Sequence, residues 1–484
     1  MLKKIFFTLI IIAIILIAVL LWLFYSKQKT NPEITFTESV KEFFPFGQPS
    51  TNIGGFPNNT ATSTENNGTV ENPDTNNTTG EVSKIPRLRQ LTKTPTSGAV
   101  IVEREKNIVE GEGKNQIKKK ITEYFVRYMY RGNGHIEETK TSSLDVTKIS
   151  NTTIPKVYET TFSPDGQIFI ARFLGDNLDD IKTYSAVLKP RVATTTSNSA
   201  TSTISVVKIN PEEANLQDVV GKYLDLNIRE IAYSPSKKNL LSLFAGGDGG
   251  SIVLSDITGS NKKTLYASAL REWLLSFPTE KTAVISTKPS GFALGVAYTL
   301  NTTTGLTSKI VGGLPGLTVL SSRNLAHILI GLGNNSLTTR IAKFDDVGST
   351  AQVINTIPEK CVWAKKDDLV VYCAIPKSIP RGVYPDDWYK GDVTLNDDVW
   401  KINVKSGISS LVVSPTKEVG QDIDVINIDI SSTDNYLTFI NKKDLTLWGY
   451  DITDEVNLKI VVATSTPSVT TSTPKTSTTT KNSI

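Results

Sequence analysis

The chain has 484 residues, of which 39% are hydrophobic and 21% are charged, and its formal charge at pH 7 is +4. A charge so close to neutral over this length gives no indication of a large basic face, so nucleic acid is a poor candidate partner. The two histidines, His135 and His327, and the two cysteines, Cys361 and Cys373, leave little room for a His- or Cys-rich metal centre. No cofactor is predicted.

Residues 1–30 are predicted to form a short N-terminal tail and a transmembrane signal anchor. The run from Ile5 to Tyr25 contains no charge, proline or glycine, and as a helix it is long enough to cross the ~30 Å hydrocarbon core of a bilayer. A cleaved signal peptide is the alternative, but its apolar region is usually about 7–15 residues long. We expect a single-pass membrane protein with a cytoplasmic N-terminus and the remaining chain outside the cytoplasm.

Residues 31–84 are predicted to form a flexible stalk, because their Asn, Thr and Ser side chains cannot bury enough apolar surface to offset the entropy of ordering. Within this stalk, the stretch from Ile34 to Gly47 (ITFTESVKEFFPFG) contains four phenylalanines. It is interpreted either as a contact with the lipid surface or as a docking peptide for another membrane protein. Residues 464–484 are predicted to be a second polar tail, and residues 193–205 an exposed loop.

Residues 85–463 show short alternating β-runs separated by turn residues, without a convincing long helix. A unit of β-run, turn and β-run recurs seven times. The units start near residues 99, 161, 231, 273, 318, 361 and 426. Three of the steps match the ~40–45 residues of a four-stranded propeller blade, and the longer steps indicate insertions. The sequence therefore predicts an all-β, seven-bladed β-propeller. The segment from Arg87 to Thr92 is expected to add an outer strand to the last blade.

One unit contains Ser163, Pro164, Asp165 and Gly166 between its two β-runs. This turn resembles the SPDG-type repeat of TolB-like, WD-like and prolyl-oligopeptidase-type propellers, in which it connects the two innermost strands. Ser234-Pro235 and the residues from Ser276 to Pro278 are partial matches. The whole plan of anchor, stalk and propeller resembles uncharacterised membrane-anchored propeller proteins of bacteria. The resemblance implies an architecture but no activity, and the chain lacks the G-x-S-x-G motif of the hydrolase partner.

The two cysteines lie at the ends of a predicted hairpin, CVWAKKDDLVVYC. With the turn at residues 366–368, Cys361 and Cys373 are expected to face each other across the two strands. A cross-strand disulfide is predicted in an oxidising, exported compartment. Two buried free thiols are the alternative.

The stretch RGVYPDDWYKGDVTLNDDVW, from Arg381 to Trp400, mixes aromatic and acidic side chains. It belongs to an insertion between residues 376 and 397 that lengthens the sixth step. Three interpretations remain open: a structural loop folded over the blade, a recognition loop for a partner or glycan, and a weak Ca²⁺ site formed by Asp386, Asp387 and Asp392. The spacing does not match an EF-hand loop. The candidate recognition residues are Arg381, Tyr384, Asp386, Asp387, Trp388, Tyr389 and Asp392.

The sequence favours a non-enzymatic binding or scaffolding module of the cell envelope, with a protein partner and with glycan as a possible ligand. No catalytic residue is predicted. The alternative is an envelope propeller enzyme, a hydrolase or lyase that acts on glycans. Such an enzyme requires carboxylates or a histidine that converge at the channel mouth, whereas a scaffold requires an exposed apolar or aromatic patch.

Overall fold

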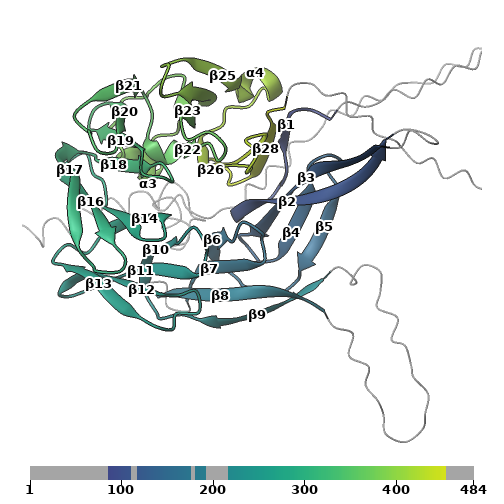
Figure 1. Ribbon diagram of the computed structural model, residues 1–484, viewed down its shortest axis with the longest axis horizontal. Coiled ribbons are helices and arrows are strands. Elements are labelled where there is room, and N and C mark those ends of the chain that lie inside the picture. The colour runs from purple at the N-terminus through teal and green to yellow at the C-terminus, as the bar shows by residue number, and fades with distance from the viewer. Residues whose placement is uncertain (1–84, 111–116, 176–179, 192–215, 454–484) are drawn as a thin grey trace, which may run out of the picture. The chain divides into compact units, whose positions relative to one another are not determined.

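The computed structural model describes residues 85–110, 117–175, 180–191 and 216–453. These residues form seven four-stranded antiparallel sheets arranged as the blades of a ring (Figure 1). The predicted all-β, seven-bladed propeller is therefore confirmed. The innermost strands begin at residues 96, 157, 228, 273, 318, 361 and 425, close to the predicted starts.

Several predicted segments lie outside the described residues: the membrane anchor, the stalk with its phenylalanine-rich stretch, the 193–205 loop and the C-terminal tail. Among the helices of the described residues, none has the length and apolar character needed to cross a membrane.

The first three blades comprise residues 96–268. Blade 1 consists of β2 (Thr96–Glu110), β3 (Ile117–Tyr130), β4 (Ile136–Lys140) and β5 (Val146–Ser150). Blade 2 consists of β6 (Val157–Phe162), β7 (Ile168–Leu174), β8 (Ile181–Pro190) and β9 (Gln217–Tyr223). Blade 3 consists of β10 (Ile228–Tyr233), β11 (Asn239–Gly246), β12 (Gly249–Asp256) and β13 (Lys263–Ser268).

The remaining blades complete the ring. Blade 4 consists of β14 (Trp273–Thr279), β15 (Thr282–Thr287), β16 (Leu294–Asn301) and β17 (Thr307–Pro315). Blade 5 consists of β18 (Thr318–Ser321), β19 (His327–Gly333), β20 (Leu337–Lys343) and β21 (Thr350–Ile354). Blade 6 consists of β22 (Cys361–Trp363), β23 (Val370–Pro376), β24 (Asp397–Asn403) and β25 (Ser409–Val413). Blade 7 consists of β26 (Val425–Ile430), β27 (Tyr436–Asn441), β28 (Leu447–Asp451) and β1 (Leu88–Gln90).

Blade 7 closes the ring with strands from both ends of the described chain. β1 pairs antiparallel with β28, with Leu88 opposite Tyr450. The Arg87 guanidinium extends this contact by donating to the carbonyls of Asp451 and Ile452 at 2.9 and 3.0 Å. The predicted outer strand is therefore confirmed, and the closure leaves only short strand edges exposed.

In blades 2 to 7 the second strand lies between its neighbours and is largely buried on both faces, whereas the start of β3 in blade 1 is exposed. β7, for example, contains Phe169, Ile170 and Ala171, which are all fully buried. These strands appear in the sequence as continuous apolar runs because both pleat faces pack against other side chains. The hydrophobic core consequently follows the ring from blade to blade.

The turn between β6 and β7 has the conformation that its sequence predicts. Gly166 has φ 68° and donates its N–H to the Ser163 carbonyl at 2.8 Å. Glycine adopts this left-handed conformation without steric cost. The same position is occupied by Lys237 in blade 3, Leu325 in blade 5 and Asp434 in blade 7, with φ of 57°, 57° and 59°.

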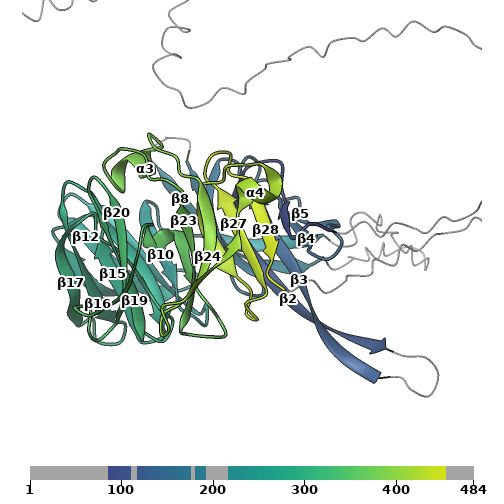
Figure 2. The same cartoon turned by 90° about the horizontal axis from the view of Figure 1, so that it is seen from above.

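The ring has two ends that differ in their connections. The turn end carries the turns between the first and second strands of the blades. The insertion end carries the links between blades and the links between second and third strands. Figure 2 shows α3 (Asp386–Lys390) at the insertion end, whereas the long β2–β3 ribbon projects at the turn end. A short helix η2 (Pro358–Lys360) precedes blade 6, and α4 (Pro415–Val419) precedes blade 7.

Candidate functional site

The β23–β24 connection forms a folded insertion across residues 377–396. Its Tyr384 side chain is fully buried and donates its hydroxyl to the Pro380 carbonyl at 2.7 Å. The Tyr384 N–H donates to the carbonyl of Asn334 in blade 5 at 2.6 Å. The approach is close enough that a Cβ at Gly333 would lie 2.2 Å from the Tyr384 carbonyl oxygen. Glycine at this position therefore allows the insertion to pack against blade 5.

Asp386 connects the insertion to blade 4. Its Oδ1 accepts a hydrogen bond from the Ser290 hydroxyl at 2.8 Å, and its Oδ2 accepts from the Gly291 N–H at 2.6 Å. Asp387 instead accepts the Val383 N–H at 2.7 Å, within the insertion itself. The two neighbouring carboxylates thus have separate structural partners.

Trp388 connects the insertion to the start of blade 7. The indole is 3% exposed, and its N–H donates to both carboxylate oxygens of Asp424 at 3.1 Å. The ammonium groups of Lys360 and Lys442 lie 4.9 and 5.1 Å from the centre of the Trp388 ring. Cations at such distances from an indole face are attracted by its quadrupole.

A fully buried ion cluster lies beneath Trp388. The Lys360 ammonium is 2.8 Å from Asp397 and 2.5 Å from Asp424, and the three side chains have no exposed surface. Burial raises the pKa of the Asp397 carboxyl, although Lys360 opposes this effect. Within the described residues, the second Asp397 oxygen has no hydrogen-bond partner.

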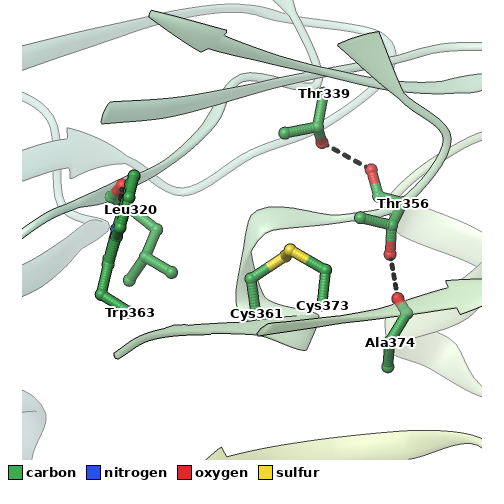
Figure 3. Close-up of a disulfide and its surroundings, with 7 residues drawn as sticks. All are labelled: Leu320, Thr339, Thr356, Cys361, Trp363, Cys373 and Ala374. Carbon is green, nitrogen blue, oxygen red and sulfur yellow. Dashed lines mark hydrogen bonds between the residues drawn. A yellow bond between two sulfur atoms is a disulfide. The ribbon is translucent and has the colours of Figure 1, made fainter. Parts of the chain in front are cut away.

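A disulfide joins the first two strands of blade 6. Cys361 and Cys373 are direct cross-strand partners with Cα atoms 4.0 Å apart, and both are buried. Figure 3 shows the bond beside two hydrogen bonds that connect blades 5 and 6. Thr339 donates to the Thr356 carbonyl at 2.6 Å, and Thr356 donates to the Ala374 carbonyl at 2.5 Å. The disulfide therefore links the first two strands of the blade from which the insertion emerges.

Tyr389 is the aromatic side chain of α3 that remains at the surface, with 36% of its area exposed. Its hydroxyl donates to the carboxylate of Glu359, in the η2 turn before blade 6. Glu359 reaches solvent but is surrounded by protein atoms, and this crowding raises the pKa of its carboxyl. Arg381 and Asp392 are also exposed.

Two more carboxylates, Glu159 in β6 and Glu230 in β10, lie on innermost strands near the insertion end. Burial, supported by repulsion from Glu159 and opposed by Arg172, raises the pKa of Glu230 in β10 to about 7. Arg172 pairs with Glu159 at 2.6 Å and donates to the carbonyl of Ile228 at 2.9 Å. The charge on Glu359 also acts on Glu230. Raised carboxyl pKa values are typical of functional sites but also occur in structural networks.

An exposed apolar pair lies next to the insertion. Phe292 and Leu294 are 79% and 71% exposed and follow the Ser290–Gly291 loop that Asp386 holds. The sequence analysis did not identify these residues. The feature of the sequence that could have pointed to Phe292 is an aromatic residue in the turn-like stretch KPSGFALG. This stretch connects the two strands of a hairpin, β15 and β16.

The predicted recognition residues therefore divide into three groups. Tyr384, Asp386 and Trp388 make contacts that hold the insertion on the ring, and Asp387 bonds within the insertion. The remaining residues, Arg381, Tyr389 and Asp392, are exposed. For the described residues, no three His, Cys, Asp or Glu side chains are grouped to hold a metal ion. The structure consequently offers no support for a Ca²⁺ site at Asp386, Asp387 and Asp392.

Comparisons with protein-family models and with curated proteins find no match to this chain.

Proposed function

We propose that the protein is a non-enzymatic, membrane-anchored binding module whose insertion end recognises a protein partner of the cell envelope. The observation that carries this proposal is the contact of Asp386 with both Ser290 and Gly291. It fastens a loop of blade 4 to the insertion of blade 6, next to the exposed Phe292.

Recognition is favoured by the rigidity of this surface. Phe292 and Tyr389 lie on segments that are hydrogen-bonded to other blades, through Gly291 to Asp386 and through Tyr384 to Asn334, so little conformational entropy is lost when a partner covers them. Aromatic anchors next to polar groups are typical of the residues that dominate protein interfaces. Burial of an apolar side chain as exposed as Phe292 would also make a favourable contribution to the free energy of binding.

The location in the envelope rests on the sequence. The apolar run from Ile5 to Tyr25 supports an anchor, and residues 31–84 support a spacer that places the propeller outside the cytoplasm. The disulfide between Cys361 and Cys373 is compatible with an oxidising compartment.

Site-specific photocrosslinking in intact membranes tests the proposed recognition face. A crosslinking amino acid is placed at Phe292 or Tyr389 of the full chain, with the 73% exposed Leu306 as the matched control. We expect the same partner to crosslink at Phe292 and Tyr389 but not at Leu306, and Asp386→Ala to weaken both crosslinks. Equal crosslinking at Leu306 would contradict a dedicated face. Deletion of residues 34–47 tests whether the stalk contributes to recruitment.

A glycan-acting hydrolase or lyase is the second candidate function. The pKa of about 7 at Glu230, together with the raised pKa of Glu359, favours groups that exchange protons near neutral pH. Incubation with purified envelope glycans tests this alternative. Turnover that disappears in both Glu230→Gln and Glu359→Gln would support an enzyme over a binding module.

A further inference from the structure

One lysine and two aspartates meet away from solvent where blades 6 and 7 join. The Lys360 ammonium lies 2.8 Å from Oδ2 of Asp397 and 2.5 Å from Oδ1 of Asp424, and none of the three side chains has exposed surface. Lys360 also donates to the Val425 carbonyl at 2.9 Å. An amine and a carboxyl group held together in a dry site are the reactants of an amide bond.

The two carboxyl groups of this cluster differ in their partners. Asp424 accepts the indole N–H of Trp388 at both oxygens and the Leu395 N–H at Oδ2, at 3.1 and 2.9 Å. Asp397 accepts the Val425 N–H at Oδ2, at 2.7 Å. Among the described residues, nothing donates to or accepts from its buried Oδ1. Donors from two segments thus hold Asp424, whereas Asp397 has one oxygen that no contact retains.

The surroundings favour an uncharged Asp397. Burial, supported by the charge on Asp424 and opposed by Lys360, raises the pKa of the Asp397 carboxyl. A protonated carboxyl group can be attacked by an amine, because its hydroxyl can leave as water. The Trp388 ring centre lies 4.9 Å from the Lys360 ammonium, and the indole is buried, so bulk water is kept from the amine.

We propose that Lys360 and Asp397 condense to an intramolecular isopeptide bond, with Asp424 as the group that transfers the protons. The reacting state is the Lys360 ammonium, the protonated Asp397 and the Asp424 carboxylate. Asp424 takes one proton from the ammonium, and the free amine attacks Cγ of Asp397. The N–C bond forms and the bond from Cγ to Oδ1 breaks.

The step balances in protons and charge. Of the three protons on the Lys360 nitrogen, one stays on the amide, one leaves through Asp424 with the Oδ1 hydroxyl as water, and one remains on Asp424. The ammonium and the carboxylate are therefore replaced by an amide, a water molecule and a neutral acid. Oxidants, reductants and cofactors are not needed.

Two physical effects favour the bond at this place. A buried charge is costly even when it is paired, and condensation removes the opposite charges of Lys360 and Asp424. Fixed neighbours also react with effective molarities that reach about 10⁵–10⁸ M. The pair of Lys377 with Asp398 lacks the first advantage, because its side chains are 30% and 15% exposed and its atoms are 3.3 Å apart.

The bond would connect the η2 turn before blade 6 to the first residue of β24, where the insertion rejoins the blade. The ion cluster is the state from which it forms, so substitution of Lys360 removes the cluster and the bond alike. This inference does not depend on which partner the propeller binds.

Peptide mapping of the full-length protein by mass spectrometry tests the bond, after purification in detergent, reduction and digestion with trypsin. We expect the peptides 344–365 and 391–401 to appear as one branched species that is lighter by one water than their sum. Cleavage after Lys360 should be absent. Fragmentation of the branched species should place the link on Asp397.

The pair of Lys377 with Asp398 is the control within the same digest. Asp398 lies on the same peptide as Asp397, and Lys377 should be cleaved normally by trypsin because no bond is expected there. Cleavage after Lys360 with two separate peptides of unreduced mass would overturn the proposal. A link that fragmentation places on Asp398 would overturn it as well.

Two variants test the roles of the residues. Lys360→Arg keeps a cation but cannot form the bond, so its peptides should have the masses calculated from the sequence. Asp424→Asn should lower the linked fraction by about tenfold or more, because general acid–base catalysis contributes about 10²–10⁴-fold in rate. Formation of the Cys361–Cys373 disulfide and the circular dichroism spectrum show whether Asp424→Asn is folded. A folded Asp424→Asn that is linked as fully as the parent would overturn the role of Asp424, and if it does not fold, the map of the parent chain decides.

Discussion

The indole N–H of Trp388 donates to both carboxylate oxygens of Asp424, each at 3.1 Å, and this contact joins the insertion of blade 6 to blade 7. Replacement by phenylalanine keeps a ring but leaves the buried carboxylate without this donor. We therefore expect Trp388→Phe to lower the free energy of unfolding by about 1–3 kcal/mol in urea titrations. Trp400→Phe is the control, and an equal loss in both variants would show that the bond to Asp424 is unimportant.

Lys360 is expected to be more sensitive to substitution than another lysine of the same blade. Lys360→Met would leave Asp397 and Asp424 without their shared buried cation, at a cost of about 3–5 kcal/mol in unfolding free energy. Lys377→Met removes a partly exposed pair with Asp398, so about 1 kcal/mol or less is expected. Chemical denaturation of both variants gives the comparison. Similar losses would mean that the buried cluster relaxes or takes up solvent.

The disulfide is expected to stabilise blade 6. The double variant Cys361→Ala/Cys373→Ala should unfold about 2–4 kcal/mol more easily than the parent. Thiol labelling provides an independent measurement, since both sulfurs are paired and buried in the native chain. No label is expected before reduction and two labelled cysteines after reduction and unfolding. Two labelled thiols in the unreduced protein would contradict the bond.

Glu230 is expected to make stability fall as pH rises. Burial raises its pKa from the ordinary value of 4.5 to about 7, so the folded chain binds one more proton than the unfolded chain between these values. By linkage, the free energy of unfolding decreases across this pH range and then levels off. Glu230→Gln should flatten this slope and be the more stable form at pH 8.

Unfolding curves of the parent and of Glu230→Gln, recorded between pH 4 and pH 8, measure this effect. Glu105→Gln, at an exposed ion pair, is the control and should change stability by about 1 kcal/mol or less. An unchanged slope in Glu230→Gln would contradict a raised pKa at this carboxyl.

Much of the architecture could be predicted because it depends on local patterns. The turn at Ser163–Gly166 and the apolar runs on either side define a hairpin from neighbouring residues alone. The register of Cys361 opposite Cys373 follows in the same way, since a short turn determines which residues face each other. The blade insertion was placed correctly because β23 and β24 end and begin at the predicted positions.

The candidate site was harder to predict because its contacts connect distant parts of the chain. Tyr384 and Trp388 were included as candidate recognition residues, and the structure buries both. Their partners Asn334 and Asp424, like Ser290 for Asp386, belong to other blades. Phe292 was missed because its exposure depends on how these loops pack.

The sequence by itself indicated the recurring hairpins and predicted seven blades, because hydrophobic period and turn chemistry act over a few residues. Ring closure was expected from the segment at Arg87, but it pairs Leu88 with Tyr450, strands from opposite ends of the described chain, and the tertiary structure decided it. Only the tertiary structure decided which aromatic side chains of the insertion face solvent. That outcome depends on the closed ring, which brings Asp386 onto Ser290 and Trp388 onto Asp424 across blades.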